Sequence, residues 1–428
     1  YISSQPYPEK AIDLLDLACV EAQLRRPRLK SDVRLMIEDI SAVAANLSGI
    51  PVSTVQSDER KSLLDLEKTI SKQIIGQDEA VVSLSKALRK ARLGLSDSTR
   101  PLASLLFLGP TGVGKTEMVR VLSSQLFGEA SPTASRLIKL DMSEFRERHT
   151  VSRLVGSPPG YVGFGQGGEL TEKVARNPYS VILVDEMEKA APEVLNIFLQ
   201  VMDEGILTDG EGAAVDFRHT IVIFTSNVGA ELIKKGTMGF SLPAQAGLPI
   251  SGQKGDSFNL PATLSLARRA GAKSHGTTEK PRSGATKEGV TFEEMKDKLL
   301  AELKNSFRPE FLNRLDSIIV FKKLAMNDVV KIARVYLRKI AKRFAQKGIY
   351  LKFETPAVSY LSKEGFSEEY GARFLKRKIE EKVVDTLSSY LLSGRVKEGD
   401  KVLIKASKRG LSFDIIKGKR LSLTSAKL

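Results

Sequence analysis

Gly109-Pro110-Thr111-Gly112-Val113-Gly114-Lys115-Thr116 follows directly on the apolar run 105–108 and precedes a segment with helical periodicity. This Gly-x-x-x-x-Gly-Lys-Thr pattern has physical meaning where it lies between a strand and a helix. Its glycines let backbone N–H groups turn toward phosphate oxygens, and the helix adds the positive end of its dipole. Lys115 can reach the terminal phosphates, and the Thr116 hydroxyl can hold Mg²⁺. The stretch therefore predicts a nucleotide site in a P-loop α/β domain.

Four more short apolar runs alternate with helical stretches on either side of this loop. They occupy residues 137–140, 181–184, 221–224 and 318–321. Continuous β-branched and leucine runs separated by helices are typical of a parallel sheet covered on both faces. We therefore expect a five-stranded parallel sheet flanked by helices.

Two carboxylates follow the run 181–184, and an amide follows the run 221–224. Asp185 and Glu186 would lie at the carboxyl edge of the sheet, where ligands bind in open α/β folds. Asp185 could hold the water shell of Mg²⁺, and Glu186 could polarise the water that attacks the γ-phosphate. Without the phosphate loop this pair would be an ordinary strand end with solvated acids. Asn227 could hold the same water or cap a turn, and the sequence leaves both interpretations open.

Composition divides the chain into parts with different characters. A helical segment ends in a linker turn near residues 48–51, and a region rich in Gly, Ser, Pro, Ala and Lys interrupts the α/β pattern. Beyond residue 322 the pattern is mainly helical, with a short strand pair at 402–404 and 413–416. The expected parts are an N-terminal segment 1–50, a large α/β domain 57–322 with a disordered insertion 241–290, a small lid domain 323–410, and a basic tail 411–428.

The composition is that of a folded globular protein, with 42% hydrophobic and 27% charged residues. The single cysteine, Cys19, cannot form an internal disulfide, which fits a cytoplasmic location or an organelle matrix or stroma. No apolar run is long enough to span a membrane. The formal net charge of +15 favours a polyanionic partner, but the basic residues are scattered and lack interleaved aromatics, so nucleic acid is not the expected ligand.

A glycine-rich loop, 156–163, carries one exposed aromatic residue, Tyr161. Glycines beside a tyrosine allow its ring to swing through a large arc. In a monomeric enzyme this would be a surface turn.

Together these motifs resemble the second ATPase module of the Clp family of AAA+ unfoldases, with flanks most similar to its ClpC and ClpA members. The resemblance covers about residues 57–405 apart from the insertion, and residues 8–16 resemble the end of a preceding module, as in a fragment of a longer protein. The motifs that carry it lie at 76–81, 109–116, 141–145, 156–163, 168–172, 178–189, 216–218, 225–229, 307–314 and 370–373.

The resemblance implies an ATP and Mg²⁺ site with roles for particular residues. Lys115 and Thr116 match the phosphate-loop pair, Asp185 and Glu186 the metal-binding and catalytic carboxylates, and Asn227 the first sensor. It further implies a hexameric ring, in which Arg314 matches the arginine finger that completes the neighbouring site. Arg373 matches the second sensor, on the lid.

The resemblance also implies a pore that grips polypeptide. In the segment Gly160-Tyr161-Val162-Gly163, Tyr161 matches the aromatic of the first pore loop, and residues 210–214 correspond to a second pore loop. Met238-Gly239-Phe240 stands where ClpP-dependent relatives carry a loop that docks into the peptidase; an incidental hydrophobic turn is the alternative. The short interval between residues 16 and 33 leaves no room for the coiled-coil middle domain of ClpB and ClpC.

We therefore expect an ATPase that threads unfolded or tagged client proteins through a hexameric pore into a ClpP-like peptidase, with adaptor proteins as further partners. One alternative is a peptidase-independent chaperone or disaggregase with the same ATP site. A second is an AAA+ protein that acts on nucleic acid, which the scattered basic residues disfavour.

Overall fold

Five parallel strands form the sheet of the large domain, in the order β2-β3-β6-β1-β7. In this computed structural model each of these five strands overlaps one of the apolar runs in the sequence, which confirms the expected sheet. β1 pairs with β6 on one side and β7 on the other, so the loop that follows it leaves from the interior of the carboxyl edge. The strands are β1 (Ala103–Leu108), β2 (Leu137–Asp141), β3 (Val181–Asp185), β6 (Ile221–Ser226) and β7 (Ser317–Val320).

The structure describes residues 8–26, 34–48, 59–93, 97–127, 136–160, 165, 167–229, 292–367, 370–407 and 410–417. The expected insertion 241–290 and the tripeptide 238–240 lie outside these residues, as do Tyr161, Val162 and Gly163.

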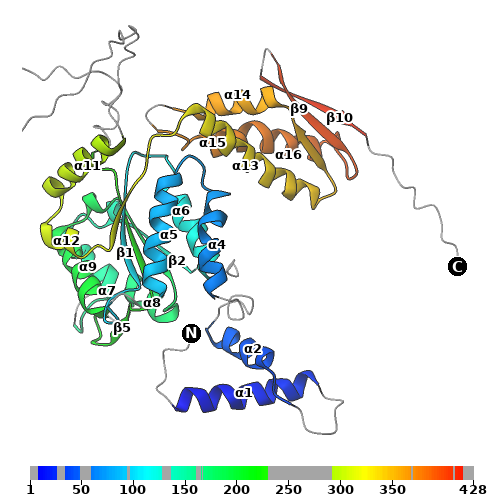
Figure 1. The fold of residues 1–428 in the computed structure, drawn as a ribbon. Coiled ribbons are helices and arrows are strands. Elements are labelled where there is room, and N and C mark those ends of the chain that lie inside the picture. The colour runs from blue at the N-terminus through cyan, green and yellow to red at the C-terminus, as the bar shows by residue number, and fades with distance from the viewer. Residues whose placement is uncertain are drawn as a thin grey trace, which may run out of the picture.

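Helices cover both faces of the sheet (Figure 1). The side chains of β1 alternate between two buried clusters: Leu105 and Phe107 belong to one, and Leu106 and Leu108 to the other. A strand buried on both faces is uniformly apolar, which is why these runs do not alternate with polar residues. The first cluster includes α4 (Glu59–Ser71), α5 (Asp78–Arg92) and α6 (Lys115–Phe127), and the second includes α7 (Val151–Val155), α8 (Glu169–Arg176), α9 (Pro192–Glu204), α11 (Phe292–Ser306) and α12 (Pro309–Asn313).

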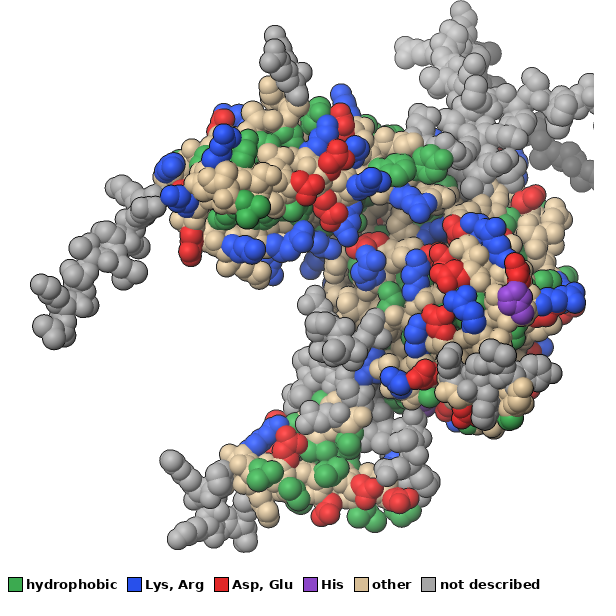
Figure 2. Space-filling view, turned by 180° about the vertical axis from the view of Figure 1, so that it is seen from behind, with side chains coloured by type: hydrophobic (Ala, Val, Ile, Leu, Met, Phe, Trp, Pro, Cys, Tyr) green, Lys and Arg blue, Asp and Glu red, His purple; other side chains and the backbone are tan. Residues whose placement is uncertain are grey.

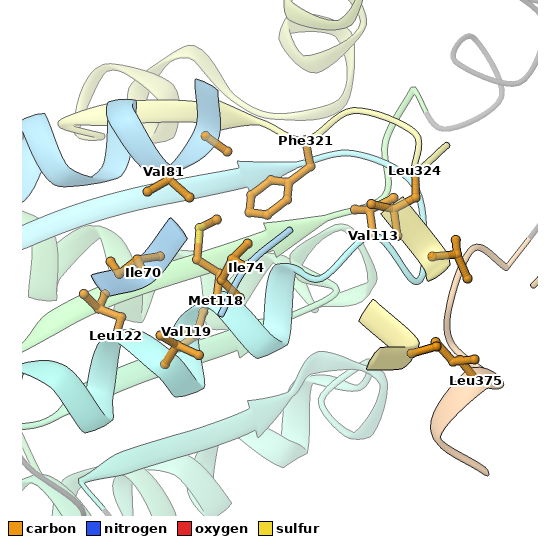
Figure 3. Close-up of a cluster of buried hydrophobic side chains, with 14 of the residues drawn as sticks. Ile70, Ile74, Val81, Val113, Met118, Val119, Leu122, Phe321, Leu324 and Leu375 are labelled. Atoms are coloured by element: carbon orange, nitrogen blue, oxygen red, sulfur yellow. The ribbon is translucent and has the colours of Figure 1, made fainter. Parts of the chain in front are cut away.

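The first cluster continues from the sheet into the second domain. Figure 3 shows Met118 and Phe321 within it, and Val113 of the phosphate loop beside Leu324. All four side chains are buried. The phosphate loop is therefore anchored in the apolar core that joins the two domains.

The lid domain packs helices against a three-stranded sheet of order β10-β9-β8, rather than the expected strand pair. The strand missed in the sequence, β8 (Tyr350–Phe353), pairs in parallel with β9 (Lys401–Ser407). β10 (Gly410–Ile416) pairs antiparallel with β9, so the segment expected as a tail from residue 411 begins as a strand of the lid. The helices are α13 (Met326–Ala345), α14 (Thr355–Gly365), α15 (Leu375–Ile379), the π-helix η4 (Glu380–Val384) and α16 (Asp385–Leu392).

The remaining elements are short or N-terminal. α1 (Glu9–Arg25) and α2 (Ile37–Ser48) pack on each other, and an ion pair of 3.0 Å joins Arg26 to Asp39. Ile12 and Leu24 on α1 keep 62% and 75% of their surface exposed, in agreement with a helix whose apolar face needs a partner surface. The other short elements are the hairpin β4 (Ile206–Thr208) and β5 (Ala214–Asp216) and the 3₁₀ turns η1 (Met142–Glu144), η2 (Arg148–Thr150) and η3 (Met187–Lys189).

The surface carries charges of both signs. Figure 2 shows acidic and basic side chains interspersed over the large domain, with Lys and Arg gathered along one edge of the lid. Within the described ranges, no helix has the length and apolar character needed to cross a bilayer.

Candidate nucleotide-binding site

The phosphate loop connects β1 to α6 and requires glycine at several positions. Gly109, Gly112 and Gly114 have φ values of +151°, +77° and +107°, which L side chains rarely adopt. A Cβ on Gly112 would lie 1.9 Å from the carbonyl oxygen of Tyr370. The lid touches the loop directly there, because the backbone N–H of Ala372 donates to the Gly112 carbonyl at 3.1 Å.

Lys115, the first residue of α6, is buried and points to the carboxyl edge of the sheet. Its Nζ donates to the carbonyl oxygens of Gly109 at 2.6 Å and Ser226 at 2.8 Å, and to Oδ1 of Asn227 at 2.8 Å. Burial lowers the pKa of Lys115 to about 8, against the opposing effect of Glu188 and other nearby carboxylates. The ammonium is thus held by neutral oxygens that phosphate oxygens can replace.

Asp185 ends β3 and is fixed by its neighbours. Its Oδ1 accepts from the hydroxyl of Thr225 at 2.5 Å, and its Oδ2 lies 3.1 Å from Nζ of Lys139. Both partners come from adjacent strands. They orient a carboxylate that, with the Thr116 hydroxyl, supplies the oxygen donors that Mg²⁺ prefers.

Glu186 has a φ of +56°, and it is the only non-glycine residue with positive φ in the part of the chain that the structure describes. Its backbone N–H donates to the hydroxyl of Thr225 at 3.1 Å, and its side chain forms a close ion pair with Lys189. A left-handed non-glycine residue costs about 1–3 kcal/mol and is concentrated at functional sites. The conformation turns the chain sharply at the strand end, next to the site of Lys115.

Asn227 follows β6 and joins the basic and acidic parts of the site. Its side-chain oxygen accepts from Lys115, and its backbone N–H donates to Oε1 of Glu188 at 3.0 Å. The side chain is therefore directed toward the phosphate loop.

These side chains line one cleft of about 360 Å³ between the large domain and the lid. A volume of this size is in the range of small-molecule sites. Ile74, Ile75 and Leu324 form an apolar part of the wall, and Arg373 and Lys376 enter from the lid. The cleft brings together the following residues named from the sequence: Thr111, Gly112, Val113, Gly114, Lys115, Thr116, Asp185, Glu186, Asn227 and Arg373.

Other residues named from the sequence lie away from this cleft. Arg314 follows α12 and pairs with Asp203, with 2.7 Å between Nε and Oδ1. Gly160 lies in an exposed turn. Residues 210–213 lie in the turn of the β4–β5 hairpin, and Ala214 begins β5.

Sequence reasoning missed Glu188, Thr225 and Lys139. Glu188 and Thr225 lie within three residues of Asp185 and Asn227, so their spacing is a usable signal. Lys139 reaches Asp185 only because β2 and β3 are neighbours in the sheet, and this strand order could not be predicted from the sequence.

Comparisons with known proteins gave matches to both the large domain and the lid. A family model described as an AAA domain of the Cdc48 subfamily matches residues 100–318, half of the chain. A model described as the C-terminal D2-small domain of ClpB protein matches residues 324–404. The chain is 40% identical to the chaperone protein ClpB of Oceanobacillus iheyensis over 96% of its length, and 44% identical to the Clp protease ATP-binding subunit ClpC of Staphylococcus epidermidis over 90%.

The chain belongs to the Clp family of AAA+ ATPases. It spans less than half of these two Clp relatives, 46% of the ClpB and 41% of the ClpC. Among solved structures it resembles a closed-state reconstruction of Hsp104 with ATPγS and FITC-casein, with a TM-score of 0.68 and 31% identity, covering 96% of this chain and 61% of that one. The two matched models correspond to the two domains of this Clp module.

We expect nucleotide binding by this Clp module to depend on pH, because burial lowers the pKa of Lys115. Because that pKa is about 8 instead of 10.5, the buried ammonium lowers the free energy of unfolding at neutral pH. This destabilisation of the folded chain is lost as the pH rises from 8 to 10.5, where the folded chain has released the proton and the unfolded chain still holds it. Phosphate binding needs the ammonium, so we expect ATP affinity to fall up to about tenfold between pH 7 and 9. Calorimetric titration at several pH values measures this slope. Lys115→Ala should bind weakly with a flat pH profile; the same slope in both proteins would assign the effect to another group.

Proposed function

We propose that this chain is the ATP-hydrolysing module of a motor that unfolds proteins by threading them through a hexameric pore. The observation that carries the proposal is the single cleft in which Lys115, Asp185, Glu186 and Asn227 of the large domain meet Arg373 of the lid. A nucleotide bound there contacts both domains at once. Loss of its γ-phosphate therefore changes the forces between the domains, and the lid angle with them.

Five polar side chains of the cleft would take part in hydrolysis. Lys115 binds the β- and γ-phosphates in exchange for its present oxygen partners. Thr116 and Asp185 would hold Mg²⁺, which when bound neutralises charge that develops on the phosphates. Glu186 orients and polarises the attacking water, and Asn227 steadies that water without neutralising the carboxylate.

The cleft lacks one cation that the family's mechanism uses. Arg314 does not line it, and in the proposed ring Arg314 of one subunit completes the site of the next. A finger acting between subunits makes a monomer nearly inactive, since a finger of this kind accounts for about 10³–10⁵ in kcat.

The test of threading is Tyr161→Ala in a protein-unfolding assay. A tyrosine ring can grip polypeptide of almost any sequence because the contact is largely apolar. We expect the variant to keep ATP hydrolysis within about twofold, because the preceding residue, Gly160, lies in an exposed turn and does not line the cleft, and to lose unfolding of a tagged fluorescent protein. Unchanged unfolding by Tyr161→Ala would overturn the threading mechanism.

The threaded polypeptide has two candidate destinations, a ClpP-like peptidase or release as by a chaperone. The ClpC relative is named as a protease subunit and the ClpB relative as a chaperone, at 44% and 40% identity, so the two destinations have comparable support. Met238-Gly239-Phe240 favours delivery to a ClpP-like peptidase. Adding such a peptidase to the same assay distinguishes them: peptide release that disappears when the tripeptide is replaced by small polar residues supports delivery. Remodelling that the peptidase does not alter supports the chaperone.

A further inference from the structure

Arg314 is held within its own subunit by contacts at both its side chain and its backbone. Its Nε lies 2.7 Å from Oδ1 of Asp203, in the last turn of α9. Arg100 donates from Nη2 to the Arg314 carbonyl at 2.5 Å and from Nε to the Met202 carbonyl at 2.8 Å. The end of α9 and the residue that follows α12 are therefore joined by one ion pair and one bridging guanidinium.

The geometry of the ion pair suits a side chain that must point outward. The contact uses Nε, the guanidinium nitrogen nearest the backbone, and a planar guanidinium bound there can still present its terminal N–H groups to a phosphate. Neither Arg314 nor Asp203 lines the cleft of its own subunit. An ATP site that this pair serves would therefore belong to another subunit.

Folding stability does not account for the pair. The side chains of Arg314 and Asp203 are 49% and 33% exposed, and the buried Oδ1 of Asp203 accepts no hydrogen bond from the described residues, so the contact is a charge pair without a directed hydrogen bond and adds little to stability. The negative charge of Asp203 favours the arginine rotamers that keep the guanidinium beside it, whereas an arginine side chain without this neighbour would sample many rotamers in solvent.

We propose that Asp203 is a positioning residue that aims Arg314 into the ATP site of the neighbouring subunit. The inference rests on the proposed function, in which Arg314 acts between subunits. A catalytic group displaced by about 1 Å can lose up to about 100-fold in rate. Asp203→Asn keeps the size of the side chain and removes its charge, so we expect kcat to fall about 10- to 100-fold with little change in ATP affinity or in the thermal unfolding midpoint.

Mixing variants in one assembly separates positioning from a general structural role. Glu186→Gln subunits have a disabled site but an intact Arg314, whereas Asp203→Asn subunits have an intact site but a misdirected Arg314. When the two are mixed, Asp203→Asn sites that receive Arg314 from a Glu186→Gln neighbour should recover, and hydrolysis should exceed the sum of the separate proteins. Glu204→Gln is the matched control, because this adjacent acid is exposed and its side chain accepts a hydrogen bond from Gln200 on its own helix. It should keep the parent rate.

Arg314→Ala mixed with Glu186→Gln tests the underlying assumption. If this mixture recovers and the Asp203→Asn mixture does not, Asp203 supports its own site and the positioning role is wrong while the finger stands. If neither mixture recovers, the finger between subunits is wrong and the role of Asp203 falls with it. A parent-like kcat for Asp203→Asn alone would also overturn the inference.

Discussion

Glu186→Gln is expected to bind ATP with near-parent affinity and to lose hydrolysis by about 10²–10⁴-fold, the range for removal of a general base. The amide keeps the size of the side chain and cannot accept a proton from the attacking water. Lys115 and Asp185 are unaltered, so phosphate binding should survive. Single-turnover phosphate release and calorimetric ATP binding, measured on the same preparation, separate these two effects.

The matched control for this variant is Glu193→Gln. Glu193 lies on α9 and pairs with Arg148 at 2.8 Å, outside the cleft. It should hydrolyse ATP at the parent rate. Hydrolysis by Glu186→Gln at that same rate would exclude Glu186 as the base, and Glu188 would become the next candidate because it is bound to the backbone of Asn227.

The strands were predictable from sequence because a parallel sheet buries both faces. All six residues of β1 and all six of β6 are buried, and the continuous apolar runs 105–108 and 221–224 within them stand out against their helical surroundings. β8 was missed because only alternate residues of Tyr350–Phe353 are partly buried and the strand is four residues long. The hairpin β4–β5 has three-residue strands, too short to show a period.

The nucleotide site was predictable to the extent that its chemistry is local in sequence. The phosphate loop is one continuous stretch, and Asp185 and Glu186 directly follow a strand. The contacts that orient these groups are not local. Lys139 reaches Asp185 across β2 and β3, and Asp203 reaches Arg314 over more than 100 residues, so only the fold brings them together.

The contact between the phosphate loop and the lid couples the movements of these two parts. The Ala372 N–H donates to the Gly112 carbonyl, and Arg373, the next residue, lines the cleft. A shift of the loop is therefore passed to the lid through backbone rather than through long flexible side chains. The residue that precedes Arg373 is therefore in direct contact with the phosphate loop.

Gly112→Ala should accordingly be among the most damaging small substitutions in the protein. The new Cβ would lie 1.9 Å from the Tyr370 carbonyl oxygen and 3.2 Å from the backbone nitrogen of Arg373. Because these atoms are backbone, no side-chain rotation relieves the clash, and the lid segment must move away from the loop. The positive φ adds about 1–2 kcal/mol of strain. We expect ATP affinity to fall at least about tenfold, equivalent to about 1.4 kcal/mol.

Gly399→Ala separates the clash from the strain. Gly399 also has a positive φ, +91°, but a Cβ there would meet no atom within 4 Å. This control should lower the thermal unfolding midpoint slightly and leave ATP affinity unchanged, because it carries the strain alone. Calorimetric ATP titration and thermal unfolding of both variants make the comparison. Parent-like ATP affinity in Gly112→Ala would mean that the lid yields at no cost to binding, and the loop and lid would then act independently.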